Sequence, residues 1–163
     1  MNLYRLLYVN KHDARLSARE RLLGRISNQQ DFSLKDMNEI RAYRGLEPID
    51  ESRILDVRTL TKKAFSASDL TLKFRSLKRI KGVGNSLASE ILAFQNPYKY
   101  AAVTHKVWNI LVSDFDFDAE EKESEDDVSL QDYVKYLEKI RDVAVEYGMK
   151  PADAEFVLNY LYK

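Results

Sequence analysis

The chain of 163 residues contains no cysteine, and this absence removes whole classes of site at once. Without thiols there is no disulfide framework, no thiolate zinc site, no cysteine-ligated iron–sulfur cluster and no cysteine nucleophile. Glycine and proline are scarce, at five and three residues, so few positions can break a helix. No apolar run approaches the roughly 20 residues that a membrane-spanning helix needs. Residues 1–9 lack the cationic start and the cleavage site of a secretory signal, so we expect a cytoplasmic protein that enters no membrane.

A net charge is also missing, because 26 basic and 26 acidic residues cancel. Their distribution is nevertheless uneven. Residues 1–113 hold 20 Lys and Arg against 11 Asp and Glu, whereas residues 114–163 hold 6 against 15. A split of this kind can place one positive face on a neutral molecule, and phosphate affinity follows the local potential. The two parts could equally pair inside the fold, so charge alone leaves both alternatives open.

Hydrophobic residues recur at helical spacing through most of the chain, and strand patterns are almost absent. Ser33 is a predicted N-cap of one helix and Ser68 of another. Two helices are predicted to close the chain, over 128–147 and 151–162, with a proline in the first turn of the second. No repeat and no linker divides the sequence. We therefore predict a single all-α domain over residues 1–163.

The acidic segment 114–127 holds one lysine and neither glycine nor proline, and we expect a solvated loop there. Asp114, Asp116 and Asp118 have the spacing that begins a calcium loop, but Ala119 stands where such a loop needs glycine. We therefore expect no metal site and no cofactor.

Two further patterns have a functional and a purely structural interpretation. Lys11, Arg15 and Arg19 recur at four-residue spacing, which suits either a phosphate-facing stripe or an ordinary solvated helix face. The ten tyrosines include Tyr4 and Tyr8 at the same spacing. Exposed aromatic rings can stack on unpaired bases, although at helical spacing they more often belong to the core and its rim.

The segment 76–92 has the pattern of a helix-hairpin-helix. Gly82 can take the positive φ that ends a helix, Val83 can plug the turn from inside, and Gly84 lets backbone amides approach a ligand closely. The next helix begins there, with unpaired N–H groups and the positive end of its dipole, and Asn85 or Ser86 is predicted to cap it. Such a concavity of N–H groups suits a phosphate oxygen. An ordinary hairpin with a glycine turn is the alternative.

Three cations surround this turn, and phosphate contacts of their kind supply affinity that does not depend on sequence. We therefore predict duplex DNA as the partner. The predicted DNA-binding residues are Lys78, Arg79, Lys81, Gly82, Val83, Gly84, Asn85 and Ser86.

These residues resemble the helix-hairpin-helix DNA glycosylase superfamily, which contains endonuclease III and the 8-oxoguanine glycosylases, and the run into the hairpin looks like that of short bacterial members. The resemblance is clearest over residues 58–111 and weaker over the closing helices. It implies a glycosylase-like helical fold, duplex DNA binding and a place in base-excision repair. The segment 96–108 resembles the one that carries the family's catalytic aspartate onto the next helix.

The resemblance fails at the catalytic positions. Thr104 occupies the position of the aspartate that stabilises the cationic sugar, and Ser86 occupies the position of the lysine that forms a Schiff base in lyases. Neither side chain can replace the residue it stands for, so any catalytic residue is unknown and enzymatic activity stays open. His105 is expected at the surface, and Trp108 in the core.

Three hypotheses follow. The first is a DNA-binding protein of this superfamily without standard Asp/Lys catalysis. The second is an active glycosylase with a non-standard catalytic residue. Asp114 and Asp116 are candidates for that residue, although they lie more than two helical turns beyond Thr104. The third is a protein-interaction module whose hairpin is purely structural. The sequence does not indicate a lesion or an oligomeric state.

Overall fold

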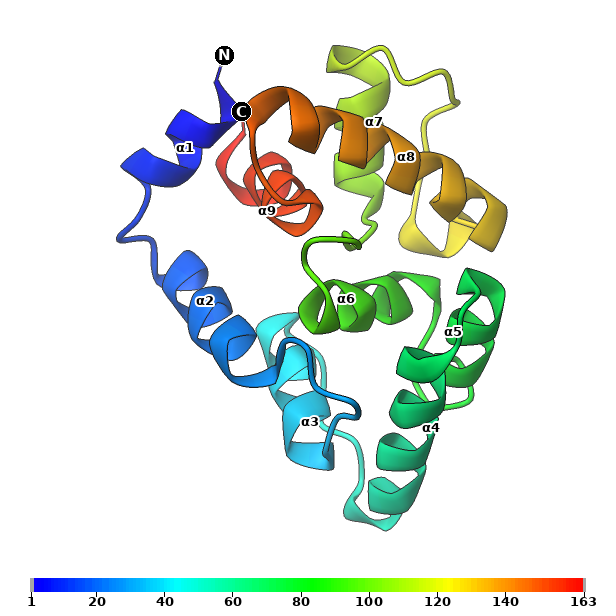
Figure 1. The fold of residues 1–163 in the computed structure, drawn as a ribbon. Helices are drawn as coiled ribbons and strands as arrows, with labels where there is room; N and C mark the ends of the chain where they lie inside the picture. Colours follow the sequence, from blue (N-terminus) through cyan, green and yellow to red (C-terminus); the bar gives the residue numbers. More distant parts are fainter. Residues whose placement is uncertain (1, 163) are drawn as a thin grey trace.

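The computed structural model describes residues 2–162, which form one all-α domain with no strand among them (Figure 1). The α-helices are α1 (Leu3–Val9), α2 (Ala14–Ile26), α3 (Leu34–Tyr43), α4 (Ile54–Ser66), α5 (Leu70–Leu77), α6 (Asn85–Gln95), α7 (His105–Asp114), α8 (Leu130–Tyr147) and α9 (Pro151–Phe156). Two short 3₁₀ turns, η1 (Glu51–Arg53) and η2 (Glu125–Asp127), and a π-helical turn, η3 (Val157–Leu161), complete the described chain. In this part of the chain no helix is long and apolar enough to cross a membrane.

Helix α6 lies in the middle of the fold, between two groups of helices (Figure 1). On one side α2, α3 and α5 pack against α6, and α4 packs against α5. On the other side α7, α8 and α9 form a second group, in which α1 packs against η3. The two ends of the chain therefore lie side by side, and α6 is the element that both groups share.

Large aromatic side chains fill the core of the second group. Trp108, Tyr133 and Tyr136 are fully buried, and the Trp108 ring lies 6.2 Å from that of Tyr136 in a stacked arrangement. The two tyrosine hydroxyls donate to the carbonyls of Ala101 and Ala102, at 2.9 and 2.7 Å. Because this segment before α7 is buried and extended, its carbonyls need such donors. The prediction that Trp108 belongs to the core is confirmed.

The ends of α3 and α8 follow local sequence signals, whereas the start of α5 differs from its prediction by one residue. Ser33 and Asp36 form a reciprocal capping box at α3, and Gly148 ends α8 with a φ of 65°. At α5 the cap is Asp69, whose side chain accepts from the amide of Leu72, so the prediction of Ser68 was wrong by one position. A carboxylate and a hydroxyl serve equally at this position, which is why the sequence allowed both.

The acidic segment 114–127 is largely a loop with most of its acidic side chains exposed, as predicted, but its backbone is also anchored to the core. The Trp108 indole N–H donates to the carbonyl of Glu120 at 2.8 Å. Asn109 makes two hydrogen bonds of 2.8 Å with the backbone of Lys122, and Phe117 packs edge-on against Trp108. These contacts hold the segment against α7 and place η2 next to α6.

Candidate nucleic-acid interface

The hairpin, by which we mean α5, the turn at residues 78–84 and α6, has the geometry that its sequence predicts. Leu77, Ile80 and Val83 are buried under the turn, and the amide of Val83 donates to the carbonyl of Ile80 at 3.1 Å. Gly82 has a φ of +83°, which an L-residue with a side chain rarely adopts. The turn is therefore tight, with an apolar underside and an exposed backbone at Gly82 and Gly84.

The start of α6 has no side-chain cap. Its N-cap is Gly84, and the prediction that Asn85 or Ser86 would cap the helix was wrong. The Asn85 amide group instead donates to the carbonyl of Val128 at 2.8 Å, and the Ser86 hydroxyl donates to the carbonyl of Val103 at 2.7 Å. Both side chains are thus drawn into the tertiary structure and away from the helix end.

The first amides of α6 are consequently left without acceptors. Within residues 2–162, the backbone N–H groups of Gly84, Asn85 and Ser86 donate to no backbone or side-chain atom. These groups carry the positive end of the helix dipole, and a phosphate oxygen is a suitable acceptor for them. A Cβ added at Gly84 would meet no atom of the chain within 4 Å, so the approach to these amides is open.

Cations surround the turn. Lys78, Arg79 and Lys81 are all exposed, as predicted. A fourth, Arg41, was not predicted: its guanidinium donates to the carbonyl of Gly82 at 3.3 Å from the last turn of α3. Nothing in the sequence pattern distinguishes Arg41 from any other charged residue of an amphipathic helix, because the contact spans 41 positions.

A groove of about 370 Å³ runs beside the turn, between it and the loop that precedes α4. Its charged lining is mainly basic, with Arg41, Arg53 and Lys81 against the single carboxylate of Asp50. The Asp50 carboxylate already accepts a hydrogen bond within its own turn, since it caps η1 by accepting from the amide of Ser52 at 2.8 Å. The groove therefore continues the basic surface of the hairpin.

The two positions that the resemblance identifies as catalytic lie together at the junction of the helix groups. Val103 connects them: its carbonyl accepts from Ser86, and its amide donates to the Ser89 hydroxyl at 2.9 Å. Thr104 follows directly, buried at the N-cap of α7, where its hydroxyl accepts from the amide of Val107 at 3.2 Å. Both hydroxyls are thus engaged in holding the backbone.

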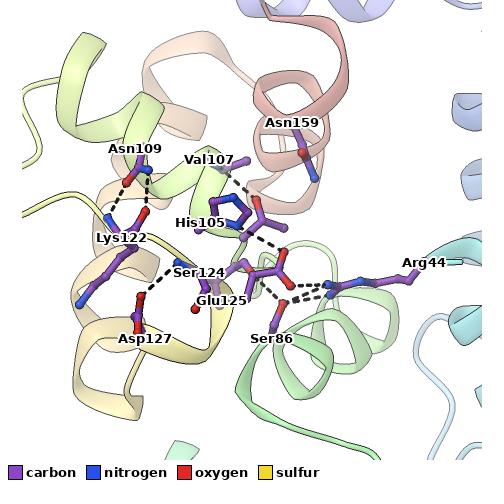
Figure 2. A network of polar contacts seen from close by, with 12 residues as sticks. Arg44, Ser86, His105, Val107, Asn109, Lys122, Ser124, Glu125, Asp127 and Asn159 are labelled. Atoms are coloured by element: carbon purple, nitrogen blue, oxygen red, sulfur yellow. Dashed lines mark hydrogen bonds and ion pairs between the residues drawn. The ribbon is translucent and has the colours of Figure 1, made fainter. Parts of the chain in front are cut away.

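An arginine and a carboxylate occupy the space around these hydroxyls (Figure 2). Arg44, directly after α3, donates from both terminal nitrogens to the Ser86 hydroxyl, at 3.1 Å each, and lies 3.3 Å from a carboxylate oxygen of Glu125. His105 Nδ1 is 3.9 Å from the other oxygen of Glu125. His105 is partly exposed, as predicted, but Arg44 and Glu125 were not predicted at this site.

Deeper in the same junction lies a pair of buried carboxylates, Glu90 on α6 and Glu155 on α9. Each side chain belongs to a residue only 7% exposed, and both line a cavity of about 10 Å³, close to the minimum for one water molecule. Burial and, to a smaller extent, the negative charge of Glu90 together raise the pKa of Glu155 to about 8. Burial likewise raises the pKa of Glu90, although the positive charges of Arg44 and Arg19 act in the opposite direction.

Arg19 belongs to this cavity and not to a surface stripe. It is buried, with its guanidinium 2.9 Å from Asp153 and 3.1 Å from Glu20. Both interpretations of Lys11, Arg15 and Arg19, as a phosphate-facing stripe or as a solvated helix face, were therefore wrong for Arg19. The alternative acids also lie elsewhere: the Asp114 carboxylate accepts from the Tyr162 hydroxyl at 2.7 Å, in a groove that Asp116 also lines.

Over residues 2–162 no group of three or more His, Asp or Glu side chains is placed to hold a metal ion. Comparisons of the chain with protein-family models, with curated proteins and with solved structures find no match. The interpretation of the site therefore rests on its geometry.

Proposed function

We propose that the chain binds duplex DNA by holding a backbone phosphate at the hairpin. The observation that carries the proposal is the uncapped start of α6, where the amides of Gly84, Asn85 and Ser86 have no acceptor within residues 2–162 and Gly84 is exposed. Three exposed cations, Lys78, Arg79 and Lys81, stand around it. Backbone amides and cations of this kind bind phosphate whatever the base sequence, so the expected affinity is non-specific and depends on salt.

The finer assignment is also a proposal. We infer a helix-hairpin-helix domain of the DNA glycosylase type, acting in the cytoplasm on duplex DNA as part of base-excision repair. Supporting it are the positive φ at Gly82, the burial of Val83 and the meeting of Ser86 and Thr104 across Val103. In a glycosylase the two catalytic groups must converge on one nucleotide, and these two positions do converge.

We further infer that standard glycosylase chemistry is absent. The transition state for base loss carries positive charge on the sugar, which a fixed carboxylate stabilises and a hydroxyl dipole stabilises far less. The Thr104 hydroxyl is already hydrogen-bonded to Val107, and the cation Arg44 faces Ser86. A cation beside a developing cation is unfavourable, so the local electrostatics oppose this reaction.

One observation supports the second hypothesis, an active glycosylase with a non-standard acid. Glu125 brings a carboxylate to the edge of this site, against Arg44 and His105. If damaged duplexes lose a base when incubated with the protein, Glu125→Gln should abolish that loss, whereas Asp114→Asn should not.

The proposal is tested by measuring duplex binding at several salt concentrations. Lys78→Ala, Arg79→Ala and Lys81→Ala should each weaken binding to all duplex sequences alike. Each should also lower the slope of log affinity against log salt by about 0.9. Lys135→Ala, which removes an exposed lysine on α8, is the matched control and should change neither value. A wild-type protein that binds no duplex at low salt would favour the third hypothesis, a protein-interaction module.

A further inference from the structure

A second surface lies at the opposite end of α6 from the hairpin turn. It contains the three most exposed tyrosines of the described chain. Tyr98, in the loop after α6, is 70% exposed, and Tyr4 and Tyr8 on α1 are 54% and 65% exposed. Exposed aromatic residues that are grouped into one contiguous patch mark an interaction site, whereas single exposed ones do not. These exposures separate the three residues from the tyrosines of the core.

The three rings line two adjoining grooves. One, of about 640 Å³, lies between Tyr98 and Tyr4, and the other, of about 370 Å³, lies between Tyr4 and Tyr8. Tyr4 and Leu7 belong to both, so the grooves form one continuous surface along α1. Met149, Pro151 and Val145 add apolar area to the larger groove. We call this surface the tyrosine face.

The tyrosine face carries more positive than negative charge. Its cations are Lys11, Arg141 and Lys150, and none of them is ion-paired within residues 2–162. Arg141 donates with two of its nitrogens to the carbonyl of Lys99, at 2.9 and 2.6 Å, which holds the guanidinium in place and leaves its charge unpaired. Its two carboxylates, Glu20 and Asp153, are both bound to the buried Arg19. The tyrosine face thus offers flat apolar rings and uncompensated positive charge.

Cations also alternate with the rings. Lys150 Nζ lies 4.6 Å from the centre of the Tyr98 ring, and Lys11 Nζ lies 5.5 Å from that of Tyr8. Stacking platforms with cations between them bind nucleic acid single strands, because every base has a flat face and every nucleotide has a phosphate. A duplex cannot use these rings, since its bases are already stacked on one another.

We propose that the tyrosine face binds single-stranded nucleic acid, with bases stacked on Tyr98 and Tyr4 and phosphates held by Lys150, Arg141 and Lys11. This proposal does not rest on the hairpin. Charge complementarity favours nucleic acid as the ligand of this surface, because a neutral apolar peptide would leave the three cations without partners. The hairpin and the tyrosine face lie at opposite ends of α6, so the two sites can be tested separately.

The test measures binding of a fluorescently labelled oligothymidylate of 20 nucleotides by anisotropy at low salt. Loss of one stacked base corresponds to 1–3 kcal/mol, so Tyr98→Ala should weaken binding roughly 5- to 150-fold. Tyr98→Phe keeps the ring and should bind within about twofold of the wild-type protein. Lys150→Ala should lower the salt dependence by about 0.7 in log–log slope.

Two controls separate this site from the hairpin and from general loss of structure. Tyr98→Ala should leave duplex binding unchanged, because a duplex cannot stack its bases on this ring. Leu55→Ala removes a side chain that is 77% exposed on α4, and it should have no effect on oligothymidylate binding. The proposal is overturned if the oligothymidylate does not bind, if Tyr98→Ala binds it as well as the wild-type protein does, or if Tyr98→Ala weakens duplex binding to the same extent.

Discussion

The buried carboxylate pair makes the stability of the protein depend on pH in a defined direction. Glu155 has a pKa of about 8 in the folded protein, raised by burial and by the charge of Glu90 from the ordinary value of 4.5. The folded state therefore binds more protons than the unfolded state between these two values. Under that condition the free energy of unfolding falls as pH rises, by up to about 1.4 kcal/mol per pH unit for one proton.

Between pH 6 and pH 8 this single group should lower the free energy of unfolding by about 2 kcal/mol. For a chain of this length, such a loss corresponds to a fall in Tm of roughly 5–9 °C. Glu155→Gln keeps the shape and the oxygen that accepts from Asn159 but cannot ionise. Glu90, whose pKa is raised mainly by burial, is present in both proteins, so the comparison isolates the contribution of Glu155.

The assay is urea unfolding at pH 6 and pH 8, followed by circular dichroism, for the wild-type protein and for Glu155→Gln. We expect the wild-type protein and Glu155→Gln to have similar free energies of unfolding at pH 6. At pH 8 the free energy of unfolding of the variant should be higher than that of the wild-type protein by about 2 kcal/mol. Glu138→Gln, at an exposed position on α8, is the control and should track the wild-type protein. If the free energies of unfolding of the wild-type protein and Glu155→Gln differ by the same amount at both pH values, Glu155 does not cause the pH dependence.

Three further predictions concern single positions of the hairpin and the junction. Gly82→Ala should destabilise the protein by about 1–2 kcal/mol in urea unfolding, because a positive φ strains any side chain and the new Cβ would lie 3.3 Å from Arg41. Ser89→Ala should cost about 1–3 kcal/mol in the same assay, because it leaves the buried amide of Val103 without an acceptor. The natural protein should excise no base from duplexes carrying common lesions, because Thr104 supplies no charge, and excision detected as alkali-labile strand breaks would contradict this.

The sequence predicted those features that neighbouring residues determine. The turn at Gly82, the N-cap at Ser33 and the end of α8 at Gly148 each depend on a few consecutive residues, and all three are present. The exposure of Lys78, Arg79 and Lys81 followed from their place at the hairpin. Local signals of this kind also explain the error at α5, where adjacent serine and aspartate are equally good caps.

The parts that were missed depend on contacts between distant residues. Arg44 reaches Ser86 across 42 positions and Glu125 across 81, and neither contact has a periodic signature. Asn85 and Ser86 left the end of α6 because acceptors from other segments, Val128 and Val103, were available. A buried Arg19 and the pairing of Glu90 with Glu155 likewise required the positions of α2, α6 and α9 in space.

The most direct test of the central claim is the affinity of Gly84→Val for a 20-base-pair duplex, measured by anisotropy at low salt. The backbone at Gly84 has a φ of −98° and a ψ of −169°, which valine adopts readily, and its side chain would meet no atom of the chain near the Cβ. It would, however, cover the amides that we assign to phosphate. Hydrogen bonds to a charged group contribute about 1.5–3 kcal/mol, so we predict a loss of roughly 10- to 150-fold at unchanged net charge.

Gly24→Ala, on an open face of α2, is the matched control and should bind as the wild-type protein does. Circular dichroism of Gly84→Val must show the wild-type helix content. If the helix content is unchanged, phosphate binding at the start of α6 predicts weaker duplex binding by Gly84→Val. Wild-type affinity of this variant would contradict phosphate binding there.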